Sequence, residues 1–188
     1  MTSLPLNRHK PYPMTLLLIF EALEKGEIKL TDRVPCSQRA REMGGSQIWL
    51  DETEELTVDE MIKAISVVSA NDCCVAMSEF IGGSEEAFVQ KMNDRAKELG
   101  MNDTAFKNCH GIDEDGHMTS AYDIAIMSRE LSKNHPEIHK YSTIWMDTLR
   151  DGKSQLVNTN KLVRFYSGCT GLKTGSTSLA LFNLSATA

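Results

Sequence analysis

Lys173, Thr174 and Gly175 form a triplet whose residue types suit the recognition of a carboxylate. A lysine at the edge of a strand supplies a fixed positive charge, and the neighbouring threonine hydroxyl adds a hydrogen-bond donor to the same anion. A glycine lets the backbone of the strand approach a ligand closely. The alternative is that Lys173 lies in an ordinary β-turn, and the triplet taken alone favours that alternative.

Ser69 and Asn71 form a second candidate motif, far from the first in the chain. A serine hydroxyl in a cleft can relay a proton to a leaving group, and an asparagine amide can hold a peptide group of a substrate. Serine and asparagine between two helices also commonly cap those helices. The two interpretations are compatible, because a capping asparagine that is held rigidly can still present its amide to a cleft.

Composition limits the classes of function. The chain has 188 residues, of which 41% are hydrophobic, so we expect a single folded domain with a real core. Its formal net charge of −6 disfavours nucleic acid as a partner, because phosphate binding needs a basic surface. The five cysteines are odd in number and lack Cys-x-x-Cys spacing, which favours buried thiols over disulfides or zinc. We therefore expect no metal and no cofactor.

Helices are predicted on both sides of the Ser69 motif. Hydrophobic spacing indicates one helix over residues 14–25 and another that ends near residue 68, opened by a capping box of Thr57 and Glu60. The next helices are expected to begin with these caps: Asn71 or Asp72 for the first, Ser84 for the second, and residues 119–123 for the third.

Strands are predicted mainly towards the end of the chain. Residues 181–186 alternate loosely and are expected to pair with the strand that carries Lys173. Residues 155–166 are expected to be extended, and short strands are expected near residues 33–36 and 47–50. The chemistry-bearing residues therefore lie on a strand and at a junction between two helices.

Taken in context, the two motifs resemble the second and third signatures of the serine-type D-alanyl-D-alanine carboxypeptidases, which are low-molecular-mass penicillin-binding proteins of the acyl-serine peptidase family. The resemblance covers nearly everything from residue 14 to residue 188. The segments that carry it are Glu21-Ala22-Leu23-Glu24-Lys25-Gly26, Gly44-Gly45-Ser46-Gln47-Ile48, Leu56-Thr57-Val58-Asp59-Glu60-Met61, Ser69-Ala70-Asn71-Asp72, Lys97-Glu98-Leu99-Gly100-Met101, Thr119-Ser120-Ala121-Tyr122-Asp123, Asn158-Thr159-Asn160-Lys161-Leu162 and Lys173-Thr174-Gly175-Ser176-Thr177.

This resemblance implies a fold of the α/β (α+β) class, in which a helical subdomain packs on an antiparallel sheet as in β-lactamases and transpeptidases. We expect one incomplete penicillin-binding or carboxypeptidase domain over residues 1–188, with sheet strands missing at both ends. Its helical region is expected at about 54–150 and its sheet elements at about 27–50 and 155–188.

The first signature of the family, a Ser-x-x-Lys that holds the nucleophile and its lysine base, is absent from the 188 residues. A count back from Glu21 without a gap places His9 at the serine position and Tyr12 at the lysine position. An alignment with a gap removes both positions, and neither alignment restores the motif. Three substitute nucleophiles lack a suitably placed base: Thr15, Thr170 and Cys73.

By resemblance, a complete site would remove the terminal D-alanine from peptidoglycan stem peptides through an acyl-serine intermediate. Lys173 and Thr174 would bind the terminal carboxylate, with Gly175 allowing close approach and the N–H of Ser176 contributing to the oxyanion hole. Ser69 would shuttle a proton, and Asn71 would position the substrate. Because the nucleophile and base are absent, we expect the chain to be inactive as written.

Two other hypotheses remain open. In the first, the chain is a non-catalytic module that binds D-Ala-D-Ala ends or β-lactams. In the second, it is an active enzyme with a replacement nucleophile. The resemblance implies a protein on the cell-wall side of the cytoplasmic membrane, although residues 1–13 lack the apolar core of a signal peptide. The expected partners are stem peptides that end in D-Ala-D-Ala, with β-lactams as ligands.

Overall fold

The computed structural model describes residues 12–179 and 181–188, so His9 lies outside the described residues. The elements follow one another in this order: α1 (Tyr12–Glu24), β1 (Arg33–Pro35), α2 (Gln38–Arg41), β2 (Glu55–Thr57), α3 (Val58–Val68), α4 (Asn71–Gly82), α5 (Glu85–Glu98), α6 (Ala121–Asn134), the 3₁₀ turn η1 (Pro136–Ile138), α7 (His139–Ser142), β3 (Met146–Leu149), β4 (Ser154–Val157), α8 (Leu162–Phe165), β5 (Gly171–Thr177) and β6 (Leu181–Thr187).

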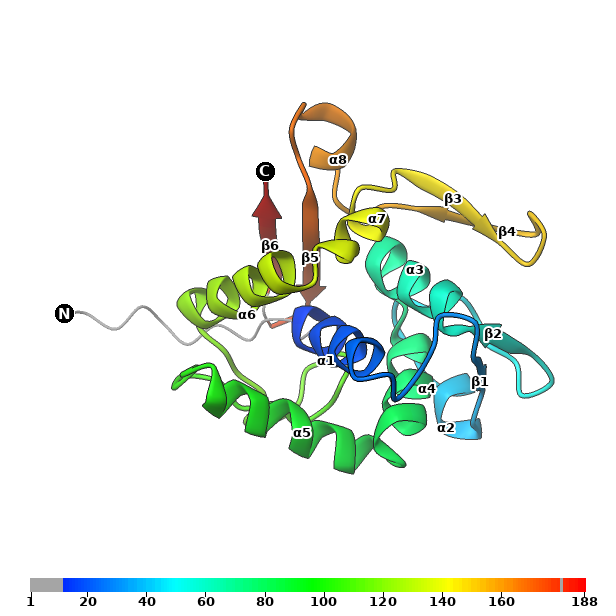
Figure 1. Cartoon of the computed structure of the whole chain (residues 1–188), viewed down its shortest axis with the longest axis horizontal. Coiled ribbons are helices and arrows are strands. Elements are labelled where there is room, and N and C mark those ends of the chain that lie inside the picture. Colours follow the sequence, from blue (N-terminus) through cyan, green and yellow to red (C-terminus); the bar gives the residue numbers. More distant parts are fainter. Residues whose placement is uncertain (1–11, 180) are drawn as a thin grey trace.

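Helix α1 is the centre of the hydrophobic core. Every residue from 12 to 20 is buried, which fits a sequence that is apolar on nearly all sides of the helix. α1 contacts α6 on one side and α3 and α4 on the other, and it also contacts α5 and β5 (Figure 1). The start of α1 is therefore held between the helices and the last hairpin of the chain.

The predicted helices are present, with one difference in how they begin. Thr57 and Glu60 form the predicted capping box of α3, and Ser84 and Ser120 cap α5 and α6 through their hydroxyl groups. α4, however, begins at Asn71 after Ala70, with no side-chain cap. Neither predicted residue is the N-cap of this helix: the Asn71 side chain binds Tyr12 and Gly44, and the Asp72 carboxylate accepts the N–H of Cys73 in the first turn as well as N–H groups of residues 48 and 50.

The strands of the described residues are antiparallel and form three separate pairs, β1 with β2, β3 with β4, and β5 with β6. β6 pairs with the strand of Lys173 as predicted, and Lys173 lies opposite Ser185. Helices and antiparallel strands in one structure agree with the predicted α+β class. The β5–β6 hairpin packs against α6, α7 and α1 (Figure 1).

Two segments expected to be extended are not strands. Residues 47–50 form a loop in which Trp49 has a left-handed backbone with φ of 55°. The N–H groups of Ile48 and Leu50 bind the Asp72 carboxylate, so this segment has no strand partner. Residues 162–165 form the short helix α8. Their Leu, Val and Phe residues suggested a strand, because a short apolar run does not distinguish a strand from a helix.

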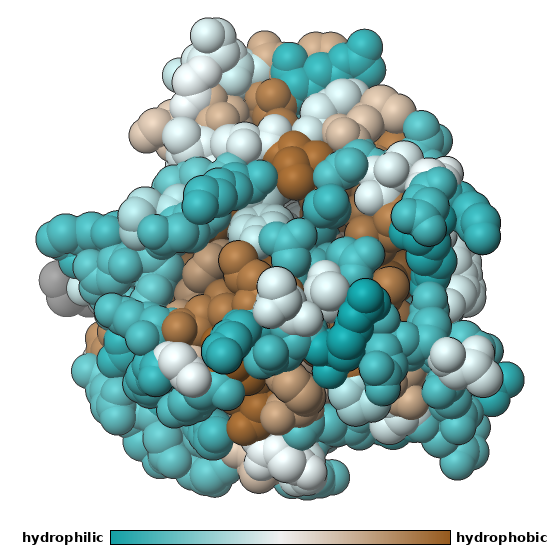
Figure 2. Space-filling model, turned by 45° about the vertical axis from the view of Figure 1, so that its right-hand side comes forward, coloured by the Kyte–Doolittle hydropathy of each residue, from teal (hydrophilic) through white to brown (hydrophobic). Residues whose placement is uncertain are grey.

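The surface is mainly hydrophilic, with hydrophobic residues gathered in the middle of the face shown in Figure 2. Several large hydrophobic side chains are exposed near the end of the chain: Phe165, Tyr166, Leu179, Leu181, Phe182 and Leu184. Cys36, Cys73, Cys74 and Cys109 are buried, as predicted, and Cys169 is partly exposed; within the described residues none of the five forms a disulfide. Within residues 12–179 and 181–188, no helix has the length and apolar character needed to cross a bilayer.

Candidate active site

Ser69 lies at the sharp turn between α3 and α4. Its backbone is left-handed, with φ of 60° and ψ of 43°, and its N–H donates to the carbonyl of Ala64 to close α3. A left-handed residue at this position reverses the chain, so that α4 can begin two residues later. Ser69 is only 6% exposed, and its side chain faces strand β5. The helix ending therefore fixes where this hydroxyl points.

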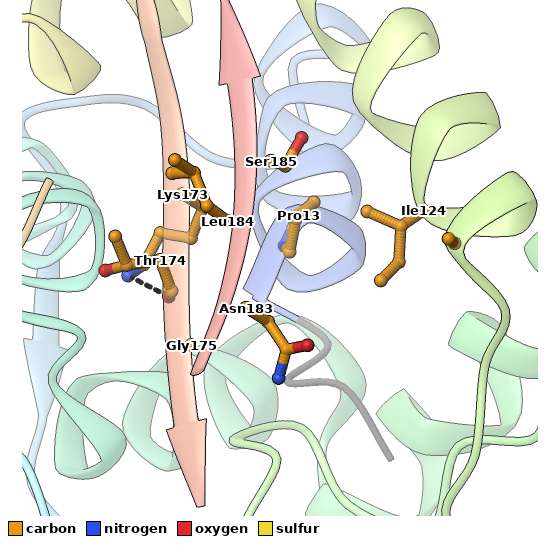
Figure 3. Close-up of a pocket in the computed structure, with 9 residues that line it drawn as sticks. Pro13, Ile124, Lys173, Thr174, Gly175, Asn183, Leu184 and Ser185 are labelled. Carbon is orange, nitrogen blue, oxygen red and sulfur yellow. Dashed lines mark hydrogen bonds between the residues drawn. The ribbon is translucent and has the colours of Figure 1, made fainter. Parts of the chain in front are cut away.

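Lys173 brings the second motif to this hydroxyl. Its ammonium group donates a hydrogen bond to the Oγ atom of Ser69 and another, of 2.9 Å, to the carbonyl oxygen of Thr174. The second of these bonds is the dashed line in Figure 3. Lys173 is only 4% exposed, so its charge is largely shielded from water. A shielded ammonium group attracts an anionic ligand more strongly than one at the surface.

Tyr12, in the first turn of α1, lies at the centre of the two motifs. Its phenol oxygen is 2.6 Å from Oδ1 of Asn71 and 2.9 Å from the carbonyl oxygen of Ser69. The Nζ atom of Lys173 lies 4.6 Å from the centroid of the Tyr12 ring. Burial raises the pKa of Tyr12 well above its ordinary value, so the phenol stays protonated and donates its hydrogen bond.

Asn71 is fully buried, and both ends of its amide bind within the protein. Oδ1 accepts from Tyr12, while Nδ2 donates to the carbonyl of Gly44 at 2.7 Å. The backbone N–H of Asn71 donates to the carbonyl of Ser46, also at 2.7 Å. Asn71 therefore joins the start of α1 to residues 44–46, and in this structure its amide does not line the pocket.

Asp72 fixes the neighbouring loop from the same turn of α4. Its carboxylate accepts the N–H groups of Ile48 at 3.0 Å, Leu50 at 3.1 Å and Cys73 at 2.9 Å. Burial raises the pKa of Asp72 and outweighs these hydrogen bonds, which lower it. Asp72 thus holds residues 46–50 against the site, although it takes no part in the pocket itself.

Two adjoining pockets lie along strand β5 and share Thr174, Gly175, Asn183 and Leu184. The first has a volume of about 100 Å³ and lies between the hairpin and the starts of α1 and α6, where Pro13 and Ile124 line it (Figure 3). The second has a volume of about 340 Å³ and is also lined by Ser46, Ser69, Thr159, Ser176 and Phe182. Only the second is large enough for a ligand the size of a dipeptide.

Thr159 reaches the second pocket from the loop after β4. Its hydroxyl forms a hydrogen bond with the hydroxyl of Thr174, and its N–H donates to the carbonyl of Val67 at 3.2 Å. The next residue, Asn160, donates from Nδ2 to the carbonyl of Gly171 at 3.2 Å. This loop therefore connects the end of α3 to the beginning of β5.

The structure brings most of the predicted site residues together. Ser69 and Lys173 are joined by a hydrogen bond between their side chains. Thr174, Gly175 and Ser176 line the larger pocket beside Ser69. Hydroxyl groups next to a shielded ammonium group suit the binding of a carboxylate. Thr159 and Asn183 also line the pocket without having been predicted for the site, and Tyr12 lies at the site unpredicted as well. The gap-free count from Glu21 was the one signal for it, because it places Tyr12 at the position of a catalytic lysine.

Comparison with known proteins decides the family. The sequence matches the family described as D-alanyl-D-alanine carboxypeptidase over residues 13–188. The chain belongs to the D-alanyl-D-alanine carboxypeptidase family. The match begins directly after Tyr12, so the family likeness includes all of the motifs described above except that residue. The family resemblance inferred from the sequence is confirmed.

One curated relative of the chain is the D-alanyl-D-alanine carboxypeptidase DacF of Bacillus subtilis. It is 54% identical over 178 residues, which cover 93% of this chain and 46% of the relative. D-alanyl-D-alanine carboxypeptidase DacC of Escherichia coli is 32% identical over 93% of this chain and 45% of its own length. The chain therefore spans about half the length of the curated relatives that it matches.

Solved structures confirm the predicted fold of the family. Penicillin-binding protein 5 of Haemophilus influenzae has a TM-score of 0.89 at 31% identity, over 100% of this chain and 57% of that one. Penicillin-binding protein D2 of Listeria monocytogenes, solved in an ampicillin-bound form, has a TM-score of 0.86 at 26% identity, over 97% of this chain and 74% of that one. The α+β penicillin-binding fold is thus present.

Proposed function

We propose that this chain carries the substrate-recognition part of a D-alanyl-D-alanine carboxypeptidase site, and that it binds peptides ending in D-Ala-D-Ala without forming an acyl-serine on its own. The observation that carries the proposal is the group formed by Lys173, Ser69 and Thr174. Lys173 lines the adjoining pocket of about 100 Å³, and its shielded ammonium group reaches the wall of the 340 Å³ pocket through its hydrogen bond to the Ser69 hydroxyl. The terminal carboxylate of the peptide binds Lys173 and Thr174.

The remaining predicted residues complete this arrangement. Strand β5 carries Gly175 and the exposed Ser176 along the wall of the pocket, where the backbone can bind an extended peptide. In a complete enzyme the N–H of Ser176 would hold the oxyanion formed at the attacked carbonyl, and Ser69 would relay a proton. In this structure Asn71 acts through residues 44–46 rather than through the ligand.

The absence of Ser-x-x-Lys from the sequence is the reason for proposing recognition without acyl transfer. In a serine protease of another fold, loss of the nucleophile alone lowers the rate by about a millionfold. A β-lactam, which carries a carboxylate beside a reactive amide, is a second ligand of the same site. We place this activity on the cell-wall side of the membrane, because the family acts on peptidoglycan peptides.

The direct test is titration calorimetry of the purified chain with N-acetyl-D-alanyl-D-alanine. The matched ligand is N-acetyl-D-alanyl-D-alaninamide, which lacks only the terminal carboxylate. We expect the amide, and the variant Lys173→Met, to bind about 10- to 100-fold more weakly, since one charge-assisted hydrogen bond contributes about 1.5–3 kcal/mol. The variant Lys153→Met, at an exposed turn between β3 and β4, is the control and should bind normally.

Intact-protein mass spectrometry after incubation with excess penicillin tests the catalytic half of the proposal. We expect no covalent adduct from protein that circular dichroism shows to be folded. An adduct equal in mass to the drug would show that a replacement nucleophile exists. Peptide mapping would then identify it, and the bond between Ser69 and Lys173 makes Ser69 the first residue to examine.

A further inference from the structure

Three residues from three separate elements meet at Tyr12. Lys173 of β5 places its ammonium group 4.6 Å from the ring centroid, and Asn71 of α4 places Oδ1 at 2.6 Å from the phenol oxygen. Ser69, at the end of α3, contributes its carbonyl oxygen at 2.9 Å. Tyr12 itself is completely buried.

The two parts of the Tyr12 side chain interact with different partners. The face of the ring carries the negative part of the aromatic quadrupole, and it attracts the ammonium group of Lys173. The hydroxyl group has a single proton, which it shares between Asn71 and the carbonyl of Ser69. The ring and the hydroxyl can therefore be removed separately by substitution.

The position of Tyr12 explains why a tyrosine suits this chain. A count back from Glu21 without a gap places Tyr12 where the family motif has its lysine. A second ammonium group at this point would lie close to the charge of Lys173 and would repel it. A neutral aromatic ring removes that repulsion and replaces it with an attraction. The hydroxyl still provides a donor for Asn71, so the buried amide stays satisfied.

We propose that Tyr12 is a positioning residue: its ring holds Lys173 so that the site binds a peptide carboxylate non-covalently, while its hydroxyl stabilises the buried amide of Asn71. This inference rests on the proposed function, because it concerns the lysine that binds the ligand. It goes further in assigning a role to a residue that lies outside the family match, which begins at residue 13. Tyr12 does not touch the ligand and acts only through Lys173 and Asn71.

The first measurement needs no ligand. Protons above an aromatic face resonate upfield, so the side-chain signals of Lys173 in the NMR spectrum report whether the ring lies beneath them. We expect upfield signals in the wild-type chain and in Tyr12→Phe, and a return to ordinary lysine values in Tyr12→Leu. The control is Tyr122→Leu, which removes a tyrosine that is 74% exposed on α6 and should leave the Lys173 signals unchanged.

The second measurement is the affinity for N-acetyl-D-alanyl-D-alanine. Tyr12→Leu should bind about threefold to thirtyfold more weakly, as expected for the loss of one cation–π contact. Tyr12→Phe keeps the ring and should stay within about threefold of the wild type, even if losing the hydroxyl lowers its melting temperature. A purely structural role would instead weaken binding in proportion to the loss of stability in both variants.

The two proposals fail in different ways. Failure of the wild-type chain to bind the dipeptide overturns the proposed function, whereas the NMR signals still decide whether Tyr12 holds Lys173. Ordinary Lys173 signals in the wild-type chain overturn the role of Tyr12, and this result does not depend on whether Tyr12→Leu folds. Unchanged affinity in folded Tyr12→Leu overturns it as well.

Discussion

The carboxylate of Glu54 binds two nitrogen atoms of the Arg150 guanidinium, although the residues are 96 positions apart. The Nε–Oε2 distance is 2.8 Å, and the hydrogen bond lowers the pKa of Glu54. The same guanidinium donates to the carbonyls of Ile48 at 3.0 Å and Trp49 at 3.3 Å. One side chain therefore ties the turn after β3 to the loop that borders the site.

A double-mutant cycle on Arg150 and Glu54 should show clear coupling. We expect Arg150→Met to lower the free energy of unfolding by about 2–3 kcal/mol, because it removes a two-point ion pair and leaves loop carbonyls without a donor. The coupling energy with Glu54→Gln should be about 1–2 kcal/mol, measured by urea denaturation. The exposed pair Arg41 and Glu52 is the control and should show no measurable coupling. Equal coupling in both pairs would contradict this account.

Asp72→Asn should destabilise the protein by about 2–4 kcal/mol in urea denaturation. The amide has one acceptor oxygen in place of two, so N–H groups of Ile48 and Leu50 lose their charged partner in a buried region. Asp51→Asn alters an exposed carboxylate three residues after Ile48 and is the matched control. A similar stability for the two variants would show that Asp72 does not hold the loop.

Gly45→Ala should cost more stability than Gly26→Ala. Both glycines are left-handed, with φ of 76° and 70°, so both substitutions carry a backbone penalty of about 1–2 kcal/mol. A Cβ atom at Gly45 would lie 2.7 Å from Nδ2 of Asn71, whereas one at Gly26 would meet nothing within 4 Å. We expect a further loss of about 1–3 kcal/mol at Gly45, from overpacking against a fixed amide. Calorimetric melting of both variants gives the difference directly.

The stability of the protein should fall as the pH drops from about 6.5 to 4. Burial lowers the pKa of His117 from 6.5 to about 4. Between these pH values the unfolded chain binds a proton at His117 and the folded chain does not. The stabilisation is complete above pH 6.5 and decreases by up to about 3 kcal/mol towards pH 4. Urea midpoints across this range should follow this curve, and His117→Asn should flatten it.

A second decrease is expected below pH 4.5. Burial alone would raise the pKa of Glu85, but the His110 ring, whose Nε2 lies 3.4 Å from Oε1 of Glu85, lowers it to about 2 with help from Arg39. The folded chain then holds this proton less tightly than the unfolded chain, so stability present above pH 4.5 is lost as the pH falls to 2. Glu85→Gln should remove this part of the pH dependence and leave the part due to His117.

Local signals in the sequence predicted the helices well. The capping box of Thr57 and Glu60 and the cap of Ser84 depend on hydrogen bonds between residues three apart, which the sequence displays directly. The pairing of residues 181–186 with the strand of Lys173 also followed from a short connection. The prediction of a strand at residues 47–50 was wrong because the partner of these residues is a carboxylate on α4 and not another strand.

For the site, the sequence by itself determined the family and displayed both motifs, and its 188 residues contain no Ser-x-x-Lys pattern. Only the tertiary structure decided that Lys173 binds Ser69, that Asn71 is buried, and that Tyr12 lies between them. The physical reason is distance along the chain. Propensity and periodicity report on neighbours within a turn or two, whereas Tyr12 and Ser69 are 57 residues apart, and Ser69 and Lys173 are 104 apart. Contacts of that range form only when the helices pack around α1 and bring β5 against its first turn.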